Sequence, residues 1–104
     1  MDTKKIFSEV IKELREDKNL TLREVAEVLE IDTSMLGKIE KGTRKPSRLL
    51  IEKIANFFNV NASDLTIIFL SDSIAYQVLD ENDATKVLKM AEQKLEYLKT
   101  QQNS

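Results

Sequence analysis

Apolar residues recur at intervals of three and four along most of the chain, which is the spacing of one face of an α-helix. The pattern predicts helices over residues 2–18, 21–29, 33–41 and 47–58, a fifth opening at Asn61, and a last one over 83–101. The segments between them are short and polar. The sequence therefore predicts an all-α fold of five or six helices.

Capping residues stand at the ends of these segments. Thr21 and Glu24 have the spacing of a capping box at the start of the second helix, and Gly42 suits the end of the third. Asp32, Ser47 and Asn61 are further N-cap residues, and Asn19 tolerates the left-handed conformation of a helix end. Only about four residues join the second and third helices, which matches a helix-turn-helix whose second helix reads the major groove of DNA.

The segment around the third helix carries a resemblance to a known family. IDTSMLGKIEKGTRKPS, residues 31–47, is similar to the recognition-helix segment of the phage-repressor and Cro-like, or Xre-type, helix-turn-helix family. It includes the I-E-x-G motif and a proline four residues after that glycine. The resemblance covers roughly residues 6–66. It implies a five-helix lambda-repressor-like DNA-binding domain over 1–66, followed by a C-terminal helical extension over 67–104.

The distribution of charge supports a nucleic-acid partner although the net charge of the 104 residues is −2. Residues 32–48 carry five basic and two acidic side chains and form the only positive segment. The attraction to phosphate is local, because salt screens it within about 10 Å. A basic face around the third helix is therefore sufficient, and double-stranded DNA is the expected partner.

Composition narrows the remaining function classes. The chain has no Cys and no His, which excludes disulfides, thiolate zinc sites, a cysteine nucleophile and histidine acid–base catalysis. We therefore expect no enzyme activity, catalytic residue, metal site or cofactor, and no small-molecule pocket is evident. No apolar run reaches membrane-spanning length, and the N-terminus lacks the apolar segment of a signal peptide. A cytoplasmic protein without membrane contact is expected.

Candidate contacts with DNA follow from the first turn of the third helix and the turn after it. The resemblance aligns Thr33, Ser34 and Lys38 with base-contacting positions of the family. Lys38 suits guanine, and the two short hydroxyl side chains are less selective. The predicted phosphate contacts are Arg23, Lys41, Thr43, Arg44, Lys45 and Arg48. Gly37 has two interpretations, close approach to DNA or a neutral surface residue.

The resemblance also implies a partly buried ion pair between Arg15 of the first helix and Glu40 of the third. Two solvated charges are the alternative. Leu22 departs from the family, whose members usually carry Gln there for a phosphate contact. Glu30 replaces a common turn glycine.

The last third of the chain contains more apolar residues than a single small domain is expected to bury. Ala84, Leu88, Ala91, Leu95 and Leu98 recur at intervals of four and three over two heptads. This helix either forms an arm of a homodimer or folds back on its own domain. In the dimer interpretation the interface residues are Ile68, Phe69, Ile74, Leu88, Ala91, Leu95 and Leu98.

Together these features predict a transcriptional regulator, a repressor that binds a palindromic operator as a homodimer. Residues 69–98 are similar to C-terminal extensions of short Xre-type regulators encoded near DNA methyltransferases, so a restriction–modification controller is a narrower interpretation. The alternative is an antitoxin-like interaction module whose C-terminal helices bind a partner protein.

Overall fold

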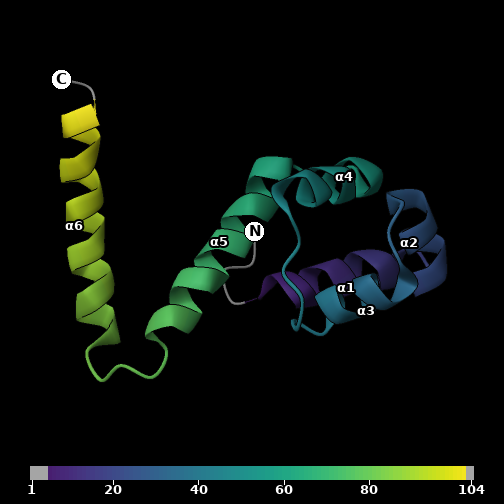
Figure 1. The fold of residues 1–104 in the computed structure, drawn as a ribbon, viewed down its shortest axis with the longest axis horizontal. Coiled ribbons are helices and arrows are strands. Elements are labelled where there is room, and N and C mark those ends of the chain that lie inside the picture. The colour runs from purple at the N-terminus through teal and green to yellow at the C-terminus, as the bar shows by residue number, and fades with distance from the viewer. Residues whose placement is uncertain (1–4, 103–104) are drawn as a thin grey trace. The chain divides into compact units, whose positions relative to one another are not determined.

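The computed structural model describes residues 5–102, and within them it contains six α-helices and no strand (Figure 1). The helices are α1 (Phe7–Asp17), α2 (Leu22–Leu29), α3 (Thr33–Glu40), α4 (Arg48–Phe58), α5 (Ala62–Val78) and α6 (Ala84–Gln102). The all-α prediction is confirmed. The first helix begins later than predicted: residues 2–4 of the expected helix lie outside the described residues, and residues 5 and 6 precede α1.

The chain divides into two compact units, Met1–Asp72 and Ser73–Ser104. The division falls within α5, as does the boundary predicted between residues 66 and 67. The first unit therefore contains α1 to α4 and the first part of α5. The second contains the last turns of α5 and all of α6.

Short-range capping fixes the ends of several helices in the first unit. The Thr21 hydroxyl accepts a 3.1 Å hydrogen bond from the Glu24 amide, and the Glu24 carboxylate accepts a 3.0 Å hydrogen bond from the Thr21 amide. Together they complete the capping box. Ser47 caps α4, and Asn61 accepts the Asp64 amide at the start of α5. Asp32 occupies the N-cap position of α3 without a side-chain hydrogen bond. These caps set where α2, α4 and α5 begin.

Helix ends in this unit use the left-handed conformation. Among residues 5–102 those with positive φ are Asn19, Glu30, Asn59 and Gly42. Asn and Gly adopt this conformation at low cost, whereas Glu30 adopts it, with φ of 59°, despite its longer side chain. The turn between α2 and α3 is thereby made by Glu30, at the position where the resemblance expects glycine.

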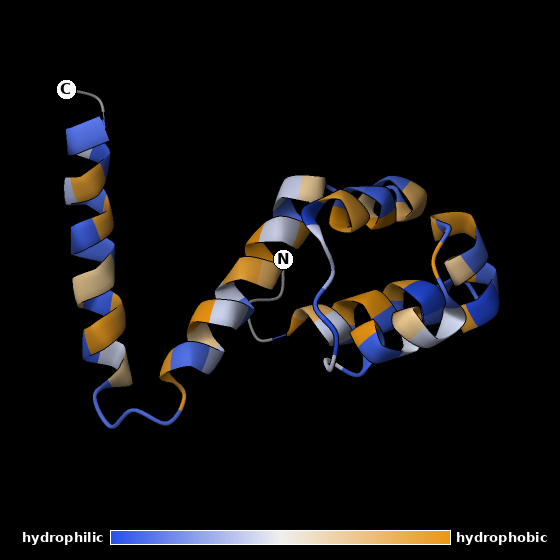
Figure 2. Ribbon diagram, viewed as in Figure 1, coloured by the Kyte–Doolittle hydropathy of each residue, from blue (hydrophilic) through white to orange (hydrophobic). Residues whose placement is uncertain are grey.

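The core of the first unit is formed by the inward faces of α1 to α5. Its most deeply buried large side chains are Ile11, Val25, Leu36, Ile39, Ile51 and Ile54. In Figure 2 α1 to α4 carry both apolar and polar residues along their length, as amphipathic helices do. Burial of these faces, rather than the propensity of such short helices, supplies most of their stability.

The first part of α5 is attached to the start of α1. The Phe69 ring packs edge-on against Phe7, with ring centroids 5.5 Å apart. The Phe7 amide donates a 2.7 Å hydrogen bond to a carboxylate oxygen of Asp72, so Asp72 caps α1, where Ile6 has no capping side chain. Ile68 is buried in the core and Phe69 packs against it. Both side chains therefore take part in the packing of their own unit, and their predicted part in a dimer interface stays a prediction.

The second unit exposes most of its apolar side chains. No residue of α6 is buried, and Leu88, Leu95 and Leu98 along its apolar stripe are all exposed. Ile74 on α5 is exposed as well. Among the described residues, no helix is long and apolar enough to span a lipid bilayer.

Candidate nucleic-acid interface

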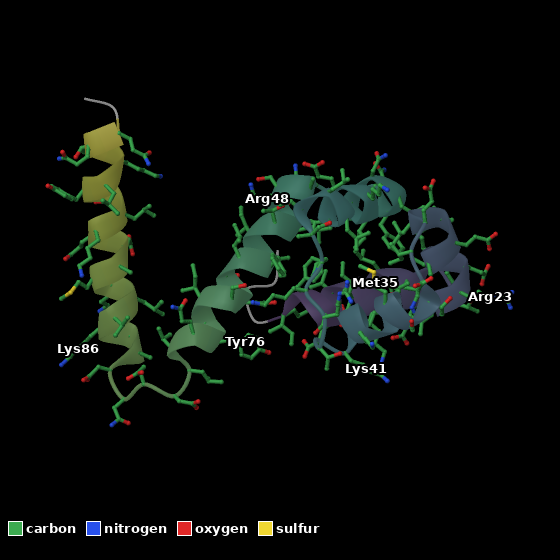
Figure 3. The ribbon with its side chains drawn as sticks, in the orientation of Figure 1. Arg23, Met35, Lys41, Arg48, Tyr76 and Lys86 are labelled. Atoms are coloured by element: carbon green, nitrogen blue, oxygen red, sulfur yellow. The ribbon has the colours of Figure 1, made fainter. Side chains whose placement is uncertain are left out.

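The α3 helix is amphipathic, and its burial separates an inner face from an outer one. Leu36 and Ile39 are buried, and Met35 is half-buried and points toward the middle of the unit (Figure 3). Thr33, Ser34 and Lys38 are exposed. The three residues predicted to contact bases therefore share the solvent side of one helix.

The cationic side chains predicted to contact phosphate are exposed on segments next to α3 in the sequence, and Figure 3 shows Arg48 apart from Lys41. Lys41 follows the last residue of α3, and Arg44 and Lys45 lie in the loop to α4; all three are exposed. Arg23 is exposed in the first turn of α2, and Figure 3 shows Arg23 and Lys41 pointing outward. Arg48 is exposed at the first position of α4. The predicted phosphate-contacting cations are therefore all accessible, on three different segments of the first unit.

The loop after α3 is held to the helix by two hydrogen bonds from one residue. The Thr43 amide and hydroxyl both donate to the Lys38 carbonyl, at 2.9 and 3.2 Å. Pro46 is buried at the far end of the loop. The Thr43 hydroxyl hydrogen is therefore engaged within the protein, whereas the Lys41, Arg44 and Lys45 side chains of this segment are exposed.

An ion pair fixes α3 to α1. Arg15 donates two hydrogen bonds to Glu40, from Nε to Oε2 at 2.8 Å and from Nη2 to Oε1 at 3.0 Å. The two side chains are 14% and 6% exposed. The guanidinium also donates to the Leu20 carbonyl at 2.8 Å, in the turn before α2. The hydrogen bond to Glu40 raises the pKa of Arg15 above its ordinary value, although burial acts in the opposite direction. Arg15 thus joins α1, the turn and α3.

The geometry is that of two short helices meeting across a tight turn, with the second supported from behind by the core and by an ion pair. The helix-turn-helix family model matches residues 11–65. The chain belongs to the helix-turn-helix family. The matched segment contains most of α1, all of α2 to α4 and the start of α5.

Two further similarities concern individual proteins. The chain is 37% identical over 60 residues to YazB of Bacillus subtilis (strain 168), described as an uncharacterized HTH-type transcriptional regulator; the match spans 58% of this chain and 87% of YazB. The crystal structure of the clp gene regulator ClgR from Corynebacterium glutamicum is 25% identical, with a TM-score of 0.56. That similarity covers 88% of this chain and 95% of ClgR. It therefore extends beyond the helix-turn-helix segment.

Proposed function

We propose that this helix-turn-helix chain is a transcriptional regulator that binds double-stranded DNA with the outer face of α3. The observation that carries the proposal is the position of Thr33, Ser34 and Lys38 on the solvent side of a helix that the core and the Arg15–Glu40 pair hold from behind. Base contacts require a rigid helix whose exposed side chains enter the major groove. YazB and ClgR, by their descriptions, are also regulators.

A homodimer on a palindromic operator is the proposed binding unit. A single helix-turn-helix offers few base contacts, so two half-sites related by a two-fold axis supply the remaining specificity. The exposed stripe of α6 supports a protein interface, since an isolated helix depends on packing of its apolar face for stability. The proposed occupant of that stripe is a second copy of this chain.

Repression is the proposed outcome of binding. A small chain bound to its operator excludes other proteins from the same stretch of DNA, and this needs no further domain. A restriction–modification controller is the narrower proposal, on the resemblance of residues 69–98. It predicts that the operator lies near a gene for a DNA methyltransferase.

An antitoxin-like module is the second candidate, because a different protein can equally cover the exposed stripe of α6. Light scattering on the purified chain separates the two. A dimer that shifts duplex DNA supports the regulator. A chain that stays monomeric until a second protein is added supports the module.

Selection of duplexes from a random pool tests the proposed function directly. We expect an enriched palindrome whose half-sites are centred about 34–36 Å apart, or a multiple of that distance. A pool that shows no enrichment over the starting library would refute sequence-specific binding.

The replacement of Lys38 by alanine tests direct base readout. Lys38 is exposed on α3 and can donate to guanine O6 and N7. We expect a loss of about 1–3 kcal/mol in affinity for the selected duplex, with relaxed preference at one base pair of each half-site. Lys53→Ala, which removes an exposed lysine of α4, is the control. Equal weakening by Lys38→Ala on all sequences would show a phosphate contact instead.

The replacement of Arg44 by alanine tests the phosphate contacts. Its side chain is exposed in the loop after α3 and reads no base in the proposed complex. We expect weaker binding to every sequence, and a plot of log affinity against log salt concentration whose slope is smaller by about one. If titrations at several salt concentrations give the slope of the unmodified protein, Arg44 does not contact the backbone of DNA.

A further inference from the structure

Gly37 lies in the middle of the outer face of α3. On a helix, Thr33 and Lys41 are its neighbours one turn before and one turn after, on the same side. Ser34 and Lys38 flank it on that side, and both are exposed. The position without a side chain is therefore surrounded by the residues proposed to meet DNA.

Nothing within the protein requires glycine at this position. Gly37 has no positive φ, and a Cβ atom built on it would find only one side-chain atom within 4 Å, Leu22 Cδ1 at 4.0 Å. That is an ordinary van der Waals distance. Glycine inside a helix is less favourable than alanine, because it loses more backbone entropy on folding. The fold would thus tolerate alanine and gain stability from it, so the reason for glycine here does not lie in the packing of the protein.

The side chain nearest to this space is apolar, although polar residues lie before and after it on the same face of α3. The Gly37 carbonyl accepts a 3.1 Å hydrogen bond from the Lys41 amide, so it already has a partner within the protein. The nearest side chain is Leu22, half-buried at the start of α2 and packed against the core. A group that entered this space would meet the Gly37 α-carbon and a Leu22 methyl group, with the Thr33 and Ser34 hydroxyl groups one turn away on the same face.

The geometry points to the C5-methyl group of a thymine as the occupant of this space, with Leu22 as its side wall. This inference rests on the proposed function, since it places α3 in the major groove. Thymine alone presents an apolar group on the floor of that groove, and the other base edges there present donors and acceptors. Gly37 and Leu22 would then determine specificity through shape, beside the hydrogen bonds of Lys38.

The test uses the duplex that the unmodified protein selects from a random pool. Each thymine is replaced in turn by deoxyuridine, which removes only the methyl group. We expect the unmodified protein to lose about fourfold in affinity at one thymine of each half-site, as for burial of a single methyl group. Replacements elsewhere in the duplex should have no such effect.

Two variants then assign the effect to this part of α3. In Gly37→Ala the new methyl group occupies the space, so binding to the thymine duplex should weaken about tenfold and the deoxyuridine duplex should become the better ligand. In Leu22→Ala the preference for thymine should shrink toward equality. Each preference is a ratio of two affinities measured on one protein sample, so a change in the folded fraction cancels.

The outcomes separate the two proposals. If the unmodified protein selects a duplex but binds every deoxyuridine version equally, or if Gly37→Ala keeps the thymine preference, the methyl site is refuted while the proposed function stands. If no duplex is selected, the proposed function fails, and the methyl site fails with it.

Discussion

Replacement of Arg15 by alanine is expected to lower the free energy of unfolding by about 3–5 kcal/mol. The change leaves the Glu40 carboxylate, whose side chain is only 6% exposed, without its partner. It also removes the donor to the Leu20 carbonyl in the turn before α2. A buried charge without a partner costs far more than an exposed pair contributes, so the effect should exceed that of any exposed charge on α1.

Urea denaturation measures this difference as a shift of the midpoint at unchanged slope. Lys12→Ala is the matched control, since Lys12 is an exposed cation on the same helix. A double variant, Arg15→Met with Glu40→Leu, should recover much of the loss because neither charge is then stranded. If Arg15→Ala and Lys12→Ala destabilise equally, Arg15 and Glu40 act as two solvated charges.

The same pair links stability to the proposed interface. Glu40 is the last residue of α3, and Arg15 connects it to α1 and to the turn before α2. The outer face of α3 is therefore oriented from its C-terminal end as well as by Leu36 and Ile39. Loss of the pair should weaken DNA binding because α3 is then held less firmly in its orientation. No residue proposed to contact DNA is removed by this change.

Features that depend on a few adjacent residues were predictable from the sequence. The Thr21–Glu24 capping box, the Ser47 and Asn61 caps and the positive φ of Gly42 each arise from residues within one helical turn. Helical periodicity likewise placed Thr33, Ser34 and Lys38 on the exposed face, because burial of Leu36 and Ile39 fixes the rotation of α3.

Features that depend on distant residues were not predictable in this way. Asp72 caps α1 across 65 positions of sequence, and no local pattern marks a carboxylate that serves another helix. The same docking decides that Ile68 turns inward, since the apolar residues of α5 are spread around the helix and their periodicity does not choose a face. Val60, an apolar residue after the end of α4, is 37% exposed, whereas Phe7 at the start of α1 is buried, and local sequence does not separate the two.

In the candidate site, too, some features follow from local sequence and others depend on how distant segments pack. Exposure of the basic residues followed from their positions, but the engagement of the Thr43 hydroxyl by the Lys38 carbonyl depends on the conformation of the loop. The contact between Leu22 and the Cβ position of Gly37 depends on how closely α2 approaches α3. Gly37 therefore had two interpretations from the residues alone, and the open space beside it is visible only once α2 and α3 are packed together.

Replacement of Leu95 by aspartate is expected to have the largest effect on DNA binding, although Leu95 contacts no DNA in the proposed complex. Leu95 is 52% exposed in the apolar stripe of α6, where a carboxylate would be buried in the proposed dimer. Sedimentation should show a monomer, and affinity for the palindrome should fall about 100-fold or more because two linked half-sites become independent. Gln93→Asp, at an exposed position between the leucines of the stripe, is the control and should leave both properties unchanged. A Leu95→Asp protein that remains dimeric would show that the interface lies elsewhere.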